Sequence, residues 1–340
     1  MKVLVTGYKG YVGSILCRIL REQNYEIVGC DIGYFPNRFL RNYSNEMCVF
    51  SNDIRDITVE ELRDINSIIH LAALSNDPLG EIKPTITNEI NYSATVKLAT
   101  LAKKAGVERF IFSSSCSIYG NSSKIVTEDS DQAPITAYAR SKINAEKDLL
   151  LLKDENFIPV ILRNATVYGA SPSQRLDLVV NNLTASAFTT GKVKLLSDGT
   201  AWRPLLHVED MANAFIECVK ASKDKIIGEI FNVGSNEQNF IIKDIADVVQ
   251  EIIPKSKIEY SKNSDKDERS YKVSFDKIRE SLNYRTHWSL KDGIKQLYDL
   301  FKVKNFSEED FKDKNFHRVK YLKWLLENKI IDDNLRFLNK

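Results

Sequence analysis

The residues of this 340-residue chain best suited to proton transfer are a tyrosine and a lysine four positions apart. Tyr138 and Lys142 stand in the segment YARSK, and residues with this spacing are neighbours on one face of a helix. An ammonium group held close to a phenol lowers the phenol pKa from its reference of about 10, so Tyr138 could act as a general base. Upstream, Ser115 ends the apolar run RFIFSSS, where its hydroxyl could meet the same substrate oxygen. Because most Tyr-Lys pairs are solvated surface pairs, the interpretation depends on the surrounding motifs.

A glycine-rich turn near the start of the chain predicts a phosphate-binding site. Gly7, Gly10 and Gly13 occupy every third position of GYKGYVG, after the apolar run VLVT and before an amphipathic segment. Small residues at a strand-to-helix junction let the backbone approach a pyrophosphate, and the amides and dipole at the helix start stabilise its charge. The spacing is G-x-x-G-x-x-G, close to the general dinucleotide fingerprint G-x-G-x-x-G.

An acidic residue follows this turn at the distance that a dinucleotide site requires. Asp31 stands eighteen residues after Gly13, where a carboxylate can receive the ribose hydroxyls of an adenosine. A carboxylate there repels a 2′-phosphate and favours NAD over NADP, although the nearby Arg38 and Arg41 act in the other direction. We therefore predict NAD as the cofactor.

The elements that position these residues alternate regularly through the first half of the chain. The β-rich runs VLVTG, EIVGCD, SIIHLAA and RFIFSSS alternate with amphipathic segments at 12–22 and 91–105. This pattern predicts an α/β fold of Rossmann type, in which helices cover both faces of a doubly wound parallel sheet. A further apolar run at 158–163 continues the sheet, and beyond it the alternation stops.

This change of pattern predicts three parts. We expect an NAD-binding domain at 1–165, with part of 203–225 packing back on it, and a smaller mixed α/β substrate domain at 166–300. No linker rich in Pro, Gly or Ser separates the two, so we expect a ligand cleft between closely packed domains. Residues 301–340 are predicted to form a helical extension that docks on the body or on a second subunit.

Composition excludes several other classes of protein. Lys and Arg number 48 against 46 Asp and Glu, and the charges are interspersed, so no nucleic-acid partner is expected. The segment 261–269 alternates in sign and is interpreted as a solvated loop or a lip of the substrate site. Five scattered cysteines, no signal peptide and no run of about 18 apolar residues predict a cytoplasmic protein with no membrane contact. The four histidines lack ligand spacing, so no metal is expected.

In combination, the motifs resemble the extended short-chain dehydrogenase/reductases, and among them the NAD-dependent nucleotide-sugar epimerase/dehydratase family. The motifs stand in that family's order: TGYKGYVG, Asp31, Asp53-Ile54, HLAA, Asn91, SSSCSIYG, Tyr138-x-x-x-Lys142, RNATVYG, GTAWRPLLHVED, FNVG and Arg269. The resemblance covers about residues 1–300, and the final forty residues lie outside it.

The resemblance implies roles for individual residues and an oligomeric state. Ser115, Tyr138 and Lys142 would form the catalytic triad. The cofactor-binding residues would be Gly7, Gly10, Tyr11, Val12, Gly13, Asp31, Asp53, Ile54, Leu71, Ala72, Ala73, Asn91, Tyr138 and Lys142. The residues implied to bind a nucleotide-diphosphate sugar are Ser75, Ser117, Asn181, Arg203 and Arg269. The resemblance also implies a homodimer formed through two helices of the first domain.

The resemblance implies a shared first step and leaves the second step open. Tyr138 would take a hydroxyl proton while a hydride leaves the same ring carbon for NAD. The 4,6-dehydratases carry an Asp-Glu pair where Cys116 and Ser117 stand, and the UDP-glucuronate decarboxylases carry Glu at the Ser117 position. We therefore favour a 4-epimerase that serves polysaccharide biosynthesis. The alternatives are a nucleotide-sugar 4-oxidoreductase and, less favoured, a 4,6-dehydratase.

Two further interpretations concern catalysis. The epimerising cysteine of GDP-fucose synthase falls at the Ser117 position, so Cys116 is interpreted as a small buried residue beside the cofactor. An alternative from another class is an NAD-binding regulator that has lost catalysis, against which the intact Ser115, Tyr138 and Lys142 argue.

Thr166 and Pro204 stand where many relatives have Asn and Asp, which leaves the substrate specificity open.

Overall fold

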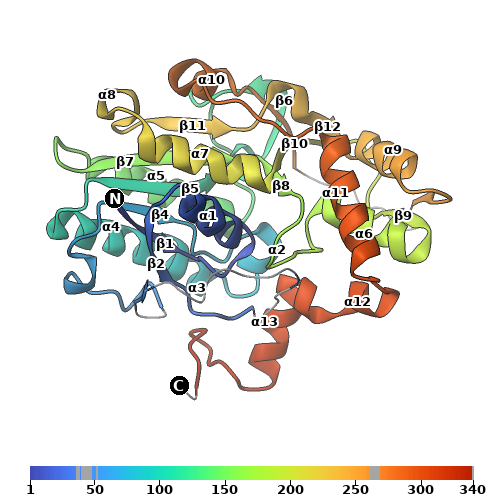
Figure 1. Ribbon diagram of the computed structural model, residues 1–340, viewed down its shortest axis with the longest axis horizontal. Helices are drawn as coiled ribbons and strands as arrows, with labels where there is room; N and C mark the ends of the chain where they lie inside the picture. The colour runs from blue at the N-terminus through green and yellow to red at the C-terminus, as the bar shows by residue number, and fades with distance from the viewer. Residues whose placement is uncertain (36–38, 40–47, 51–52, 261–268, 339–340) are drawn as a thin grey trace.

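A parallel sheet forms the centre of the molecule (Figure 1). The computed structural model describes the chain except residues 36–38, 40–47, 51–52, 261–268 and 339–340. Within the described residues the sheet has seven strands in the order β11-β7-β5-β4-β1-β2-β3. These strands are β1 (Lys2–Thr6), β2 (Glu26–Cys30), β3 (Cys48–Val49), β4 (Ser67–His70), β5 (Arg109–Ser115), β7 (Ile158–Asn164) and β11 (Ile230–Val233).

Alternating side chains along these strands bury both faces of the sheet, as expected for a doubly wound fold. On β1, Val3 and Val5 belong to the core cluster that α1 and α7 complete, whereas Leu4 belongs to the cluster on the α4 and α5 side. The helices around this sheet are α1 (Tyr11–Glu22), α2 (Asp77–Gly80), α3 (Pro84–Asn88), a π-helical turn (Glu89–Ser93), α4 (Ala94–Ala105), α5 (Ala137–Leu151), α7 (Val208–Lys220) and α8 (Lys223–Ile226). Figure 1 shows α1 and α7 together on the near face.

The second part of the chain has its own core, to which α6, α9 and α11 contribute. Its small sheets pair β10 with β8 and β12, and β13 with β9, while the pairing of β14 with β6 joins it to the first part. The elements are β6 (Asn121–Val126), β8 (Thr166–Tyr168), α6 (Val179–Thr190), β9 (Lys192–Leu195), β10 (Trp202–His207), β12 (Asn239–Ile241), α9 (Ile242–Ile252), β13 (Lys257–Tyr260), β14 (Ser270–Val273), α10 (Asp276–Leu282) and α11 (Leu290–Val303). Short 3-10 turns occur at Glu60–Leu62, Cys116–Tyr119 and Asn236–Gln238.

The segment that returns to the first domain is longer than the 203–225 expected from the sequence. Helix α7 packs on α1, and β11 then pairs in parallel with β7, from Ile230 opposite Ile161 to Val233 opposite Asn164. The return therefore extends to Val233 and adds an edge strand to the main sheet. The sequence showed the FNVG motif at 231–234 but did not predict that it forms a strand of the main sheet.

The C-terminal extension packs on the body of its own chain. Helix α11 continues to Val303, so the expected boundary at residue 301 falls inside a helix. Beyond it come α12 (Glu308–Lys312), a 3-10 turn (Lys314–Phe316) and α13 (Arg318–Glu327). Leu322 and Leu325 of α13 are buried in the same core cluster as Leu4. Figure 1 shows α13 and the C-terminus beneath the first strands.

Among the side chains that the structure describes, four cysteines are buried as free thiols: Cys17, Cys30, Cys116 and Cys218. Within the described part of the chain, no helix combines the length and apolar character needed to cross a bilayer. The same residues contain no group of three or more His, Cys, Asp or Glu side chains arranged to hold a metal ion.

Candidate active site

A cavity of about 810 Å³ opens between the carboxyl ends of the main strands and the second part of the chain. The loops after β1, β2, β4 and β5 line one side, and α6, β9 and β10 contribute to the other. This position is where ligands bind in doubly wound sheets. The volume lies toward the upper end of the range for ligand pockets, about 300 to 1,000 Å³.

The glycine turn forms a tight backbone cradle at one end of this cavity. Gly7 has φ of +74°, and a Cβ atom there would lie 2.9 Å from the Ala72 nitrogen. A Cβ atom at Gly13 would lie 2.2 Å from the Gly7 carbonyl oxygen, so the first turn of α1 packs directly on the loop. Side chains are therefore excluded where a pyrophosphate would meet the start of α1, and these residues fit a dinucleotide.

Asp31 lies beside this cradle and lines the cavity. Its carboxylate accepts hydrogen bonds from the Gly33 amide at 2.7 Å and the Lys9 amide at 2.9 Å. These bonds fix the carboxylate at the end of β2, as the predicted ribose contact requires. Arg38 and Arg41, which bear on the choice between NAD and NADP, lie outside the described residues, as does the stretch 261–268 of the expected substrate lip.

The predicted triad comes together at the centre of the cavity. Ser115 is the last residue of β5, and Tyr138 lies in the first turn of α5, which Thr136 caps through a 3.1 Å bond from the Ala139 amide. The Ser115 side chain lies close enough to the Tyr138 phenol to influence its pKa. The Lys142 ammonium donates to the Ser113 carbonyl at 2.7 Å and lies 5.7 Å from the centre of the Tyr138 ring. All three residues line the cavity.

The pKa values of Tyr138 and Lys142 differ from the expectation that Lys142 lowers the pKa of the phenol. Burial and then the negative charge of Asp77 raise the pKa of Tyr138, while the hydrogen bond with Ser115 lowers it. Burial lowers the pKa of Lys142 to about 7. The expected lowering of the Tyr138 pKa by Lys142 is therefore outweighed, because removal from water disfavours both charged forms. A further positive charge beside the phenol, such as an oxidised nicotinamide ring carries, would act in the opposite direction.

A buried ion pair holds the catalytic helix against the sheet. Glu146 of α5 and Arg163 of β7 pair at 2.8 Å, with side-chain exposures of 3% and 2%. The Ser114 hydroxyl also donates to Glu146, and the Arg163 guanidinium donates to the Tyr119 hydroxyl at 3.0 Å. The network connects α5 to the residue next to Ser115, so it positions Tyr138 relative to the end of β5.

Asn91, which was predicted to contact the cofactor, does not line the cavity. Its side chain is fully buried in the π-helical turn, away from the cavity lining. It accepts from the Leu74 amide at 2.8 Å, and donates to the Leu74 carbonyl at 3.2 Å and the Ser141 hydroxyl at 3.3 Å. Asn91 instead fixes the loop after β4 to helix α5.

The side chain of Asn181, the candidate for nucleotide contact, is likewise engaged in hydrogen bonds within the protein. It accepts from the Gly169 amide at 3.0 Å and donates to the Tyr11 hydroxyl at 3.1 Å and the Arg175 carbonyl at 2.9 Å. It is fully buried and does not line the cavity, whereas its neighbour Asn182 does. The helical turn of α6 therefore presents the next residue to the ligand.

The other predicted substrate residues line the cavity. Arg203 is 6% exposed and donates to the Trp202 carbonyl at 2.7 Å and to the Arg269 carbonyl. Arg269, just before β14, forms an ion pair with Asp77 of α2 at 2.6 Å, and both residues line the cavity. Ser75 and Ser117 lie near the triad, where the Ser117 amide donates to Ser115 at 3.1 Å.

Sequence reasoning missed three charged residues of the site. Arg175 is 5% exposed, lines the cavity, and pairs with Asp177 at 2.9 Å while donating to the Ser75 hydroxyl at 3.3 Å. Asp77 lines the same cavity close enough to raise the pKa of Tyr138. The segment SPSQRLD carried a usable signal, because an Arg and an Asp two residues apart follow the VYG motif.

Cys116 has the environment of a packing residue. It is 1% exposed, and its thiol donates to the Arg163 carbonyl at 3.1 Å. Burial raises the pKa of the thiol, which keeps the group neutral and unreactive. Its side chain does not line the cavity, in agreement with the interpretation of Cys116 as a buried residue.

The fold and the site define a dinucleotide-dependent enzyme of the extended short-chain dehydrogenase/reductase type. The profile of the NAD dependent epimerase/dehydratase family matches residues 3–234, and the chain belongs to this family. The fold class, the family and NAD as the cofactor, all predicted from the sequence, are thereby confirmed.

Individual relatives are similar at modest identity. An uncharacterized UDP-glucose epimerase of Bacillus subtilis (strain 168) is 26% identical, over 86% of this chain and 96% of its own. The dTDP-D-glucose 4,6-dehydratase of Homo sapiens is 27% identical, over 96% of this chain and 94% of its own. The solved structure of UDP-glucuronic acid 4-epimerase from Bacillus cereus, in complex with UDP-glucuronic acid and NAD, has a TM-score of 0.77 and 26% identity. That comparison covers 89% of this chain and 99% of the other.

Proposed function

We propose that this enzyme is an NAD-dependent 4-epimerase of a nucleotide-diphosphate sugar. The relatives described above are named for UDP- and dTDP-sugars, and two of the three are named as epimerases. The cavity adds a second argument, because it extends from the glycine cradle past the triad to Arg203 and Arg269. Such a space accommodates two ligands that meet at Tyr138.

The chain's own residues account for the proton transfers of this reaction. Bound NAD would accept a hydride from a ring carbon and return it. Tyr138 takes the proton of the hydroxyl on that carbon, and Ser115 shares the same oxygen through its hydroxyl. Arg203 and Arg269 hold the diphosphate, so the ketosugar can rotate about its phosphate linkage without leaving the cavity. Return of the hydride to the opposite face inverts the carbon.

The observation that carries the choice of reaction is the pair of residues after Ser115. Elimination of water needs an acid and a base, and relatives that perform it carry an Asp-Glu pair at these positions. Here Cys116 is buried against the Arg163 carbonyl, and Ser117 supplies only a hydroxyl. A 4-epimerase needs the triad and cofactor alone.

The test is to incubate the purified enzyme with UDP-, dTDP-, GDP- and CDP-sugars while following NADH absorbance and the proton NMR spectrum together. Inversion of a ring carbon with no net NADH supports the epimerase. Stoichiometric NADH with a ketosugar would replace it by an oxidoreductase, and loss of water by a dehydratase. No turnover on any sugar would favour the non-catalytic NAD-binding regulator.

Replacement of the proposed base separates catalysis from binding. Tyr138→Phe removes one hydroxyl and should lower turnover by about 100- to 10,000-fold, with NAD binding unchanged. Turnover close to that of the parent enzyme would contradict the role of Tyr138, whichever sugar is the substrate.

Assembly and cellular role are further proposals that rest on the family resemblance. A homodimer through two helices of the first domain, one of them α5, is testable by light scattering coupled to size exclusion, and a monomer at micromolar concentration would contradict it. A cytoplasmic step in the supply of a polysaccharide sugar is testable by deleting the gene and analysing the surface polysaccharide of the cell.

A further inference from the structure

Helix α13 of the C-terminal extension contributes a buried cation to the cofactor end of the cavity. Arg318 is 3% exposed, and it lines the cavity together with Val319. Its guanidinium lies 4.1 Å from the centre of the Phe35 ring and donates to the Ser173 hydroxyl at 2.8 Å. A charge this deeply buried needs partners, and besides Ser173 the Arg318 guanidinium lies close enough to Asp177 to contribute to the lowered pKa of that carboxyl.

The partners of Arg318 place it beside the expected cofactor phosphates. Phe35 follows the ribose-binding Asp31 by four residues and lines the same cavity. On the other side, the loop that holds Ser173 contacts the start of α1, because the Ser171 hydroxyl donates to the Tyr11 carbonyl at 2.7 Å. Arg318 thus lies between the ribose end of the site and the helix N-terminus, where a diphosphate would carry its negative charge.

The chain beyond α13 turns back onto the adenine end of the same site. We call residues 331–338 the C-terminal tail. Its turn is fixed by Asp332, whose carboxylate accepts from the Asn334 amide at 2.9 Å and the Arg336 amide at 2.7 Å. Leu335, at the tip of the turn, is fully buried in the core cluster that also contains Tyr34 and Ile54.

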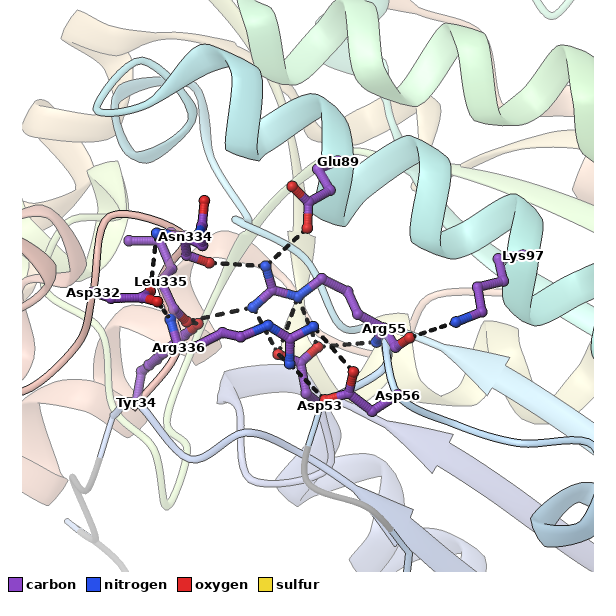
Figure 2. Close-up of polar contacts among 10 residues, drawn as sticks. All are labelled: Tyr34, Asp53, Arg55, Asp56, Glu89, Lys97, Asp332, Asn334, Leu335 and Arg336. Atoms are coloured by element: carbon purple, nitrogen blue, oxygen red, sulfur yellow. Dashed lines mark hydrogen bonds and ion pairs between the residues drawn. The ribbon is translucent and has the colours of Figure 1, made fainter. Parts of the chain in front are cut away.

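Arg55 connects this tail to Asp53, which the family resemblance places, with Ile54, against the adenine of the cofactor. Figure 2 shows its guanidinium between the tail carbonyls on one side and Asp53 on the other. It donates to the Asn334 carbonyl at 2.8 Å and to Asp53 at 2.7 Å, and it pairs with Glu89 at 3.0 Å. Only 5% of the Arg55 side chain is exposed, so its position depends on both the tail and Asp53.

Arg336 adds a second cation from the tail itself. It donates to Asp56 at 3.0 Å and lies 3.4 Å from the Asp53 carboxylate, as Figure 2 shows. The Tyr34 hydroxyl, from the loop after β2, donates to the Leu335 carbonyl. Tyr34, Asp53 and Ile54 all line the cavity, so the tail supports three wall residues from behind.

We propose that α13 and the C-terminal tail complete the adenosine half of the NAD site. Arg318 binds the cofactor diphosphate, and the tail fixes Asp53 and Tyr34 in the orientation that receives the adenosine. The extension thus determines how long NAD stays bound, which matters for an enzyme that returns its hydride within one turnover. The site is therefore built from both ends of the chain.

Arg318→Met tests the diphosphate contact, because methionine keeps apolar contact with Phe35 and removes the charge. The full-length protein is loaded with NADH, and the release rate is followed by NADH fluorescence after a chase with excess NAD. We expect release to be about 10- to 100-fold faster, with a smaller dependence on salt. The control is Lys323→Met, an exposed lysine on the same helix, which should release NADH at the parent rate. Parent-like release and salt dependence in Arg318→Met would overturn this contact.

A chain ending at Lys329 tests the tail, and we expect at least tenfold faster NADH release, with less NAD retained through purification. If this chain does not fold, Arg336→Met takes its place, and we expect a smaller increase of about two- to fivefold. Parent-like release from the folded truncated chain, or from Arg336→Met where it replaces that chain, would overturn the role of the tail. NADH release requires no sugar substrate, so these results stand whether or not the proposed epimerase activity is found.

Discussion

The two ends of the cavity are built on different principles. The cofactor end is formed largely by backbone, in which Gly7 and Gly13 leave no room for a side chain and Asp31 is fixed by two amides. The substrate end is formed by charged side chains that already contact one another, such as Arg175 with Asp177 and Arg269 with Asp77. We therefore expect the cofactor end to be rigid and the substrate end to be adjustable.

The strongest test of the rigid end is Gly13→Ala. The added methyl group would lie 2.2 Å from the Gly7 carbonyl oxygen, so the turn must open. We expect NAD affinity, measured by calorimetry, to fall about 100-fold or more. Gly10→Ala is the matched control, because its methyl group meets the same oxygen at 3.1 Å and should cost about tenfold or less. Equal losses in the two variants would contradict a backbone-limited cradle.

The ion pair behind the triad belongs to the rigid part of the molecule. Glu146→Gln leaves the Arg163 charge buried with a weaker partner, so the free energy of unfolding should fall by about 3 to 5 kcal/mol. Glu251→Gln, which removes one partner of an exposed pair with Lys291, should cost about 1 kcal/mol or less. Urea unfolding followed by circular dichroism measures both. A loss below about 1 kcal/mol in Glu146→Gln would show that the pair does not hold α5.

Within the proposed catalytic centre, the buried charge of Lys142 lowers the stability of the fold. Its pKa of about 7 in the folded state is below the 10.5 of the unfolded chain, so the unfolded state binds the proton more tightly. The resulting decrease in the free energy of unfolding is largest below pH 7 and disappears as the pH rises toward about 10. Lys142→Met should therefore raise the free energy of unfolding at pH 7 by about 2 to 4 kcal/mol while abolishing activity.

The control for this prediction is Lys147→Met, an exposed lysine on the same helix that should change stability little. Unfolding measured at pH 7 and again near pH 10 provides the second control. A stability gain for Lys142→Met that did not shrink with rising pH would point to better packing rather than to the buried charge.

At the adjustable end, Arg203→Ala should weaken the substrate without affecting the cofactor. Removal of one charged contact to a diphosphate corresponds to an increase in KM of about 10- to 100-fold. The NADH release rate should stay at the parent value, because the contact lies on the substrate side. Unchanged KM, or a parallel loss of NAD, would place the diphosphate elsewhere in the cavity.

The smallest expected effect is a shift in the pKa of Tyr138. The charge of Asp77 raises the pKa of Tyr138, so Asp77→Asn should lower that pKa. The acidic limb of the profile of kcat/KM against pH should then move toward lower pH. An unchanged limb with a raised KM would show that Asp77 acts only through its ion pair with Arg269.

The sequence predicted the two ends of the cavity unequally, for a physical reason. The glycines, Asp31 and the triad follow from short-range spacing, because each motif spans one turn or one helix. Asn91 and Asn181 do not line the cavity, because hydrogen bonds to Leu74 and Gly169, which only the folded chain brings close, take up their side chains. Arg318 could not be foreseen at all, because no local pattern shows that α13 returns to the first domain.

The four buried thiols can be used to measure local opening of the structure. Burial raises the pKa of Cys17 to about 12 and raises that of Cys30, Cys116 and Cys218 as well, so alkylating reagents react with them only when the surrounding structure opens. Cys17 and Cys30 flank the cofactor cradle, Cys116 adjoins the triad, and Cys218 lies on α7. The labelling rate of each thiol, read by mass spectrometry, therefore measures the local opening of a different layer. The native chain thus carries its own set of probes for how binding of each ligand tightens the fold.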